Sequence, residues 1–182
     1  LAAALVHSAA FRRDVQRELR SISSALVHVE APILLLKGAS YVALGLPAAD
    51  GRIFSDIDLL VADKQIAFVE SELMLGGWIT GQLDAYDDRY YRQWSHEIPP
   101  MTHTRRGTTI DLHHSLVMPT CRIAVDSSRM VNDAVPIAGS ERFWRWPASR
   151  GTRRWRALKK SAVAGRAPGG ANPPRIERAP AL

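Results

Sequence analysis

The chain has 182 residues, of which 46% are hydrophobic and 23% are charged, and it contains a single cysteine. This composition excludes a disulfide-stabilised scaffold, a cysteine-based metal cluster, a collagen-like repeat and a wholly disordered chain. At roughly 150 residues per domain, the length predicts one domain with a single hydrophobic core and a short extension.

The positive charge is concentrated at one end of the chain. The formal net charge is +6, yet residues 1–144 carry a net charge of −3 and residues 145–182 carry +9. The second segment is rich in Arg, Pro and Gly, a composition that buries too little apolar surface to offset the entropy lost on ordering. We expect a folded domain over 1–144 and a basic tail over 145–182. The tail is interpreted as disordered or frame-altered, and contact with a polyanion such as RNA is one use for it.

Membrane insertion is not expected from the sequence. No segment reaches the roughly 18 uninterrupted apolar residues that a membrane helix needs. The apolar opening, residues 1–11, is interrupted by His7 and Ser8 and has no basic residue before it, unlike a signal peptide. The sequence therefore predicts a cytoplasmic protein with no membrane partner.

A long helix is expected first in the chain. Apolar residues recur mostly at helical spacing over residues 2–29, which predicts one amphipathic helix or two shorter ones. Charged residues such as Arg17 and Glu18 are expected on its solvent side. Pro32 ends the pattern.

A strand, a glycine turn and a short helix follow. The continuous apolar run 33–36 predicts a strand buried on both faces. The turn is expected at 37–40 and the helical segment at 41–46. Residues 55–61 then predict a second strand, and residues 64–75 predict a helix that ends at a Gly-Gly pair.

An antiparallel hairpin is expected in the second half of the domain. Segments 96–104 and 108–116 can pair across Arg105-Arg106-Gly107. Helices and strands that alternate before a hairpin indicate an α/β fold, with a mixed sheet and flanking helices.

Three aspartates are the strongest candidates for chemistry. Asp56 and Asp58 lie two residues apart in a predicted strand, so their carboxylates leave the same face. Two acids there repel each other and are costly to desolvate without a cation, for which Mg²⁺ is the natural choice. Asp111, from the hairpin, could supply a third acid and allow a two-metal site. In the structural alternative, one Asp caps a helix and the other pairs with an Arg.

These residues resemble the nucleotidyltransferase superfamily that includes DNA polymerase beta. They are most similar to its uncharacterised bacterial branch, which has a Lys-Gly turn, an Arg before the acids and a late Asp-Leu-His. The matching segments in chain order are Leu35-Leu36-Lys37-Gly38-Ala39, Arg52, Ser55-Asp56-Ile57-Asp58-Leu59-Leu60-Val61 and Ile110-Asp111-Leu112-His113. The resemblance implies a nucleotidyltransferase-like fold over residues 1–144.

The resemblance also implies a reaction. A nucleoside monophosphate would pass from an NTP to an acceptor hydroxyl or phosphate, with release of pyrophosphate and dependence on Mg²⁺. Asp56 and Asp58 would hold the metal bound to the nucleotide. Asp111 would help to hold a second metal and would accept the proton of the acceptor, which is left open among a small molecule, a protein and RNA.

Four further residues are implied as phosphate contacts. Gly38 and Ser40 would approach the phosphates, and Lys37 or Arg52 would neutralise them. Glycine at such a turn has an alternative use, because it often serves only the backbone geometry.

A catalytically silent binding or regulatory protein with the same fold is the alternative function. Two departures from the broad superfamily pattern motivate it: Ala39 follows Gly38 where a second Gly is usual, and the segment 41–55 before the acids is long.

The histidines give weaker predictions. His113 shares a strand face with Asp111, where it could touch the acceptor or orient a carboxylate, whereas His114 points the other way. His96 and His103 have no zinc-ligand spacing with Cys121, so no zinc site is expected.

Overall fold

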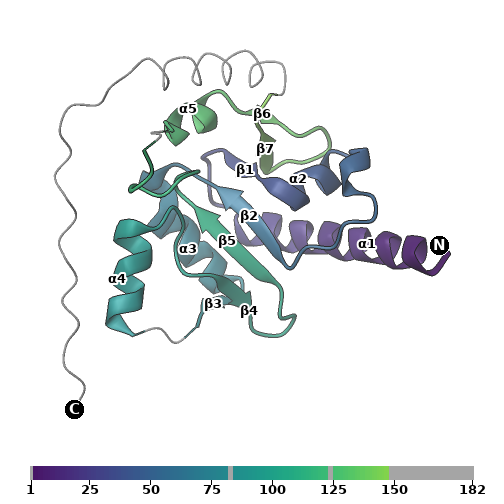
Figure 1. Cartoon of the computed structure of the whole chain (residues 1–182), viewed down its shortest axis with the longest axis horizontal. Helices are drawn as coiled ribbons and strands as arrows, with labels where there is room; N and C mark the ends of the chain where they lie inside the picture. The colour runs from purple at the N-terminus through teal and green to yellow at the C-terminus, as the bar shows by residue number, and fades with distance from the viewer. Residues whose placement is uncertain (1, 82–83, 123–124, 148–182) are drawn as a thin grey trace. The chain divides into compact units, whose positions relative to one another are not determined.

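The computed structural model describes residues 2–81, 84–122 and 125–147. The predictions for the basic tail therefore lie outside the described residues from residue 148 on. The described residues are built on a mixed sheet of seven strands in the order β3-β4-β5-β2-β1-β7-β6, with helices packed against it (Figure 1). The predicted fold class, α/β with a mixed sheet and flanking helices, is confirmed.

The elements alternate along the chain much as the sequence predicts. In chain order they are α1 (Ala2–Ala25), β1 (Ile33–Leu35), α2 (Lys37–Ala43), the 3-10 turn η1 (Pro47–Ala49), β2 (Asp56–Leu60), the 3-10 turn η2 (Asp63–Gln65), α3 (Ile66–Leu75), β3 (Trp78–Thr80), α4 (Ala85–Trp94), β4 (Met101–His103), β5 (Thr109–His113), α5 (Ser127–Asn132), β6 (Val135–Pro136) and β7 (Phe143–Arg145). The expected hairpin is β4 with β5. The predicted turn at 37–40 is instead the first turn of α2.

Helix α1 differs from its prediction in two respects. It ends at Ala25 rather than near Val29, although Leu26 and Val29 remain fully buried beyond its end. The sequence predicts Glu18 on the solvent side, whereas the structure buries it to 5% exposure. Its carboxylate accepts two hydrogen bonds from Arg106, at 2.8 and 3.0 Å, and one from Thr108 at 2.6 Å. A buried carboxylate is tolerated at this position because it is paired and hydrogen-bonded.

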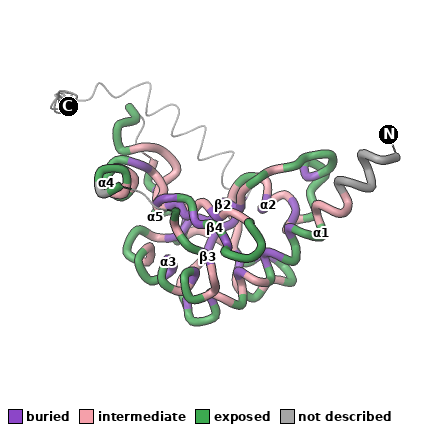
Figure 2. The backbone as a smooth tube through the Cα atoms, turned by 90° about the horizontal axis from the view of Figure 1, so that it is seen from below, coloured by how far each residue is buried: buried purple, intermediate pink, exposed green. Residues whose placement is uncertain are grey.

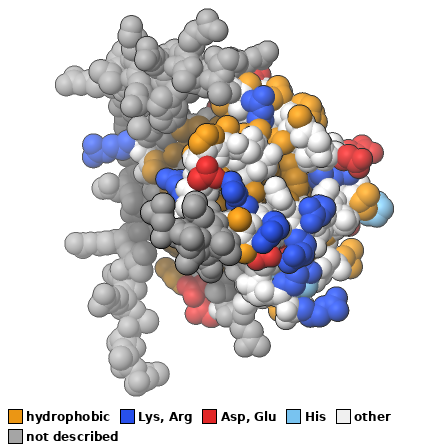
Figure 3. All heavy atoms as spheres, turned by 90° about the vertical axis from the view of Figure 1, so that its right-hand side faces the viewer, with side chains coloured by type: hydrophobic (Ala, Val, Ile, Leu, Met, Phe, Trp, Pro, Cys, Tyr) orange, Lys and Arg blue, Asp and Glu red, His pale blue; other side chains and the backbone are white. Residues whose placement is uncertain are grey.

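The outward side of α1 is basic. Arg13, Arg17 and Arg20 are exposed, and Figure 3 shows several Lys and Arg side chains on the face of the molecule that it presents. Among the described helices, none is both long and apolar enough to cross a membrane.

The two faces of the sheet carry different residues. Along β2, Ile57 and Leu59 join the main hydrophobic core with residues of α1 and α3. Because side chains alternate along a strand, Asp56, Asp58 and Leu60 leave the opposite face. We call these the core face and the acidic face. Figure 2 shows the buried stretches of backbone gathered around the central strands.

The acidic face is covered by a much smaller cluster of apolar residues. Leu34, Leu60 and Val131 of α5 form this second cluster. Strands β2 and β5 lie parallel beside each other, with Asp58 opposite Asp111. The fold therefore brings acids that are 53 residues apart in sequence onto adjacent strands of one face.

Candidate active site

The structure brings the three predicted acids together. Asp56 and Asp58 leave β2, and Asp111 leaves the parallel neighbour β5 in register with Asp58. One carboxylate oxygen from each acid lies within 4.8 Å of those of the other two. Asp58 is only 2% exposed, and the other two are half-buried. This is the convergence that the sequence predicts.

The close approach of the acids alters the protonation of one of them. Burial first, and then the hydrogen bond and charge of Asp56, raise the pKa of Asp111 to about 6. Charges from Glu97 and Asp58 add to this rise. The cluster thus holds more negative charge than its surroundings neutralise, and its donors are all hard oxygens. Such a donor set fits Mg²⁺, which prefers carboxylate oxygen.

Lys37 supplies a positive charge to this cluster. Its Nζ forms an ion pair with Asp58 Oδ1. Burial opposes the shift, but the hydrogen bond and charge of Asp58, with Asp56 and Asp111 behind it, hold the pKa of Lys37 above its ordinary value. Lys37 also has a φ of +40°, the one positive φ among the described non-glycine residues. This conformation is costly for a residue with a side chain, and such strain clusters at functional sites.

His113 contacts the same oxygen of Asp58 as Lys37 does. Its Nε2 lies 3.0 Å from Asp58 Oδ1, and its ring is 2% exposed. Burial opposes the shift, but the hydrogen bonds from His113 and Lys37 keep the pKa of Asp58 below its ordinary value. Both contacts fall on Oδ1, which leaves Oδ2 for a cation. The prediction that His113 could orient a carboxylate agrees with this contact.

His114 leaves the other side of the strand, as predicted. Its Nδ1 lies 3.7 Å from Asp63 Oδ1, outside the acidic cluster. Burial lowers the pKa of its ring.

A family model supports the assignment that this geometry suggests. The model is described as an uncharacterised nucleotidyltransferase and matches residues 1–148. The chain belongs to this family. The match contains all three acids, Lys37 and His113. No curated protein and no solved structure matches this nucleotidyltransferase-family chain.

Two of the residues implied as phosphate contacts lie in α2. Gly38 packs against Phe54, whose ring would lie 2.5 Å from a Cβ at position 38. The lack of a side chain at Gly38 is therefore explained by packing. Ser40 lies within the helix, where its backbone N–H donates to Leu36 O at 3.2 Å.

The side chain of Arg52 lies over an aromatic ring. Its guanidinium carbon lies 5.8 Å from the ring centroid of Tyr41. Within the part of the chain that the structure describes, no ion pair joins Arg52 to the three acids. Of the four predicted phosphate contacts, Lys37 is the one that the structure joins directly to the acids.

Glu97 is a neighbour of the acids that the sequence analysis missed. It forms an isolated antiparallel bridge with His113, which brings its charge near Asp111. It lies in the predicted segment 96–104, but the sequence of that segment does not predict which residue of β5 Glu97 pairs with.

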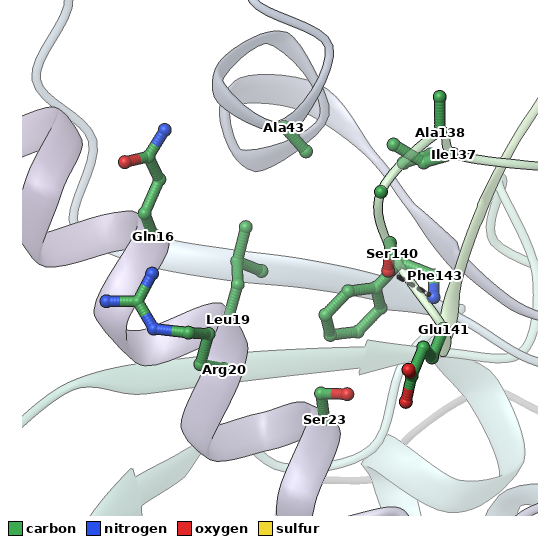
Figure 4. Close-up of a pocket in the computed structure, with 11 residues that line it drawn as sticks. Gln16, Leu19, Arg20, Ser23, Ala43, Ile137, Ala138, Ser140, Glu141 and Phe143 are labelled. Atoms are coloured by element: carbon green, nitrogen blue, oxygen red, sulfur yellow. Dashed lines mark hydrogen bonds between the residues drawn. The ribbon is translucent and has the colours of Figure 1, made fainter.

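A pocket elsewhere in this nucleotidyltransferase-family domain has a volume of about 520 Å³ and does not include the acids. It lies between α1, α2 and the segment before β7, and Figure 4 shows Leu19, Ala43 and Phe143 around it. Its lining includes no carboxylate pair, so the acidic face remains the candidate active site.

Proposed function

We propose that this chain is a Mg²⁺-dependent nucleotidyltransferase that moves a nucleoside monophosphate from an NTP to an acceptor. The observation that carries the proposal is the convergence of Asp56, Asp58 and Asp111 on adjacent parallel strands, in a chain of this family. Use of an NTP implies a cytoplasmic site of action.

The three acids have separate roles in this proposal. Bound Mg²⁺ would neutralise the phosphates and the charge that develops on the attacking and leaving oxygens. Asp56 and Asp58 would hold the ion that the nucleotide brings. Asp111 would help to hold a second ion and would accept the proton of the acceptor hydroxyl.

Lys37 would serve as a counterion that moves from Asp58 to the phosphates of the NTP. Its side chain is 62% exposed, whereas that of Asp58 is 3% exposed, so the lysine reaches the acid from the solvent side. An arriving NTP and its metal would take over Asp58 and leave the ammonium group for the phosphates. Gly38, Ser40 and Arg52 remain proposed phosphate contacts around it.

Transfer of label from an α-labelled NTP tests the proposal. Purified chain, Mg²⁺ and each NTP are incubated with separate protein, RNA and small-molecule fractions, and the labelled fraction identifies the acceptor class. Asp56→Asn should abolish labelling while circular dichroism stays unchanged. Asp63→Asn is the matched control, because the Asp63 side chain is 88% exposed and lies outside the cluster. Equal labelling by the wild type and Asp56→Asn would remove the proposed role of the acids.

A catalytically silent, nucleotide-fold binding protein is the second candidate. The ion pair between Lys37 and Asp58 favours it, because the ammonium group already neutralises part of the negative charge that a metal would neutralise. This candidate predicts nucleotide binding with no pyrophosphate release under any acceptor fraction. Pyrophosphate release that requires Asp56 would exclude it.

A further inference from the structure

A second cluster of ligand-type side chains lies beside the three acids. His96, Glu97 and His113 each place one donor atom within 4.8 Å of the donor atoms of the other two. Two imidazoles and a carboxylate form a softer donor set than three carboxylates, and they suit zinc-like ions rather than Mg²⁺. The two clusters therefore differ in the metal that they select.

The backbone fixes this second cluster. Glu97 bridges His113 in antiparallel register, so their side chains leave the same face. Ile98 N–H donates to Leu112 O at 3.0 Å, and the N–H groups of His114 and Ser115 both donate to His96 O at 3.1 Å. The segment that carries His96 and Glu97 is thus held against the end of β5.

The spacing of the donor atoms matches the size of a metal site. Glu97 Oε2 lies 3.3 Å from His113 Nδ1 and 3.5 Å from His96 Nε2. Ligand atoms about 2.1 Å from a tetrahedral ion are about 3.4 Å from one another, which follows from the tetrahedral angle. Both measured separations agree with that value.

His113 has one nitrogen that its surroundings leave unsatisfied. His113 Nε2 lies 3.0 Å from Asp58 Oδ1, and its other nitrogen, Nδ1, lies 3.3 Å from Glu97 Oε2. Within the described residues, Nδ1 is buried and has no hydrogen-bond partner. A buried polar atom without a partner is costly, and a cation held between Nδ1 and this carboxylate would satisfy both groups.

The contact between His113 Nε2 and Asp58 is of the kind that holds a metal-binding histidine in position. A ligating imidazole commonly donates its second ring N–H to a carboxylate, which fixes the tautomer and the ring orientation. His113 makes this contact at 3.0 Å to an aspartate that is 2% exposed.

From these observations we propose that His96, Glu97 and His113 bind one zinc-class divalent transition metal, with an open fourth position. The donor atoms are His96 Nε2, Glu97 Oε2 and His113 Nδ1. The proposal differs from the expectation of no zinc site, which considered His96 only with His103 and Cys121. The site does not depend on the proposed nucleotidyl transfer, because its ligands and its metal are different.

Binding of Zn²⁺ alone tests the site. The full chain, purified without a histidine tag and stripped of metal, is titrated with Zn²⁺ by calorimetry in the Asp111→Asn background, which removes one acid of the other cluster. We expect one equivalent to bind and to resist a large excess of Mg²⁺. Failure of Zn²⁺ to bind, or its displacement by Mg²⁺, would overturn the proposal.

Two substitutions at partly exposed ligands localise the metal without disturbing the core. Glu97→Gln and His96→Asn should each weaken Zn²⁺ binding by more than about 100-fold, since even loss of an outer partner costs about 10–100-fold. His114→Asn is the matched control and should leave affinity unchanged. Unchanged affinity in both ligand variants would place the ion elsewhere and contradict the assignment.

Co²⁺ supplies a readout of geometry that is independent of affinity. Four-coordinate Co²⁺ absorbs visible light much more strongly than six-coordinate Co²⁺, so the proposed site predicts an intense visible band that Zn²⁺ abolishes. The band should disappear in Glu97→Gln and persist in His114→Asn. A weak six-coordinate spectrum that is unchanged by Glu97→Gln would contradict the proposal.

Discussion

The two faces of the sheet share the same strands but carry different kinds of side chain, which affect the stability of the domain in opposite ways. On the core face, Ile57, Leu59, Ile110 and Leu112 are no more than 5% exposed and pack with α1 and α3. On the acidic face the alternate positions hold carboxylates, which repel one another and stay together only with help from Lys37 and His113. The core face stabilises the domain, and the acidic face holds groups that destabilise it in the absence of a cation.

This division implies that substitutions at nearby positions of one strand can change either the stability of the domain or the function of the acids without changing the other. Alternation along a strand places a stabilising residue next to a functional one. On the acidic face the rule that a strand buries apolar residues is broken by three carboxylates, and such conflicts are expected at functional sites.

The largest expected effect is on stability, from Leu59→Ala. Leu59 is fully buried, so the substitution should lower the free energy of unfolding by about 2–5 kcal/mol through lost burial and a cavity. Three residues earlier, Asp56→Asn should change it by less than about 1 kcal/mol, because it removes a charge from a crowded site. Urea unfolding measures both. Similar losses in the two variants would show that the faces are not separate.

A smaller gain is expected from Asp111→Asn. With metal removed by EDTA, loss of this buried charge should raise the free energy of unfolding by about 1 kcal/mol, the scale of a like-charge contact at about 4 Å in water. Asp63→Asn, on an exposed side chain, is the control. A stability loss in Asp111→Asn would mean that the carboxylate is already well paired and would weaken the case for a cation.

The smallest effect concerns His103, a polar exception on the core face. Burial first, and then the charge of Arg106, hold its pKa below the ordinary value, and its Nδ1 accepts the backbone N–H groups of Arg105 and Arg106 at 3.1 and 3.2 Å. The unfolded chain takes up a proton near pH 6.5 that the folded chain resists. Stability is therefore full above that pH and declines as the pH falls through it.

Urea unfolding of His103→Asn across this pH range measures the His103 contribution. The free energy of unfolding of the variant should depend less on pH than that of the wild type, because Asn keeps an acceptor but does not titrate. His28→Asn, at an exposed position, should keep the slope. An unchanged slope in His103→Asn would contradict the account of a buried neutral ring.

Local patterns in the sequence predict the centre of this fold well. The apolar run before Lys37 and the alternating residues around Asp58 each carry enough information to predict a strand, and the two-residue spacing of Asp56 and Asp58 predicts a shared face. Spacing alone also predicts that His113 lies on the side of Asp111. These are short-range consequences of strand geometry.

Features that depend on pairing between distant segments could not be predicted in the same way. β7 lies parallel to β1, with Phe143 opposite Ile33, and no local pattern encodes that register. Glu18 is buried because Arg106, 88 residues later, reaches it. The bridge between Glu97 and His113 is of the same kind, and it creates the second ligand cluster.

Helix α4 is a different case, because a local signal for it exists. Asp84 caps its start by accepting from the N–H groups of Tyr86 and Asp87, and Asp88 pairs with Arg92 one turn along. An N-cap followed by an i,i+4 ion pair favours a helix. The helix was missed because its aromatic residues do not form a clear apolar stripe: Tyr86 is 63% exposed and Trp94 is 43% exposed.

Thermal unfolding with each NTP, in the presence and absence of Mg²⁺, tests the central claim most directly. A ligand at 100 times its Kd that binds only the native state adds about 2.7 kcal/mol, which raises the unfolding midpoint visibly. We predict a rise that requires both NTP and Mg²⁺ and that disappears in Asp56→Asn, with Asp63→Asn behaving as the wild type. No rise with any NTP, or an equal rise in Asp56→Asn, would contradict a metal-dependent nucleotide site on the acidic face.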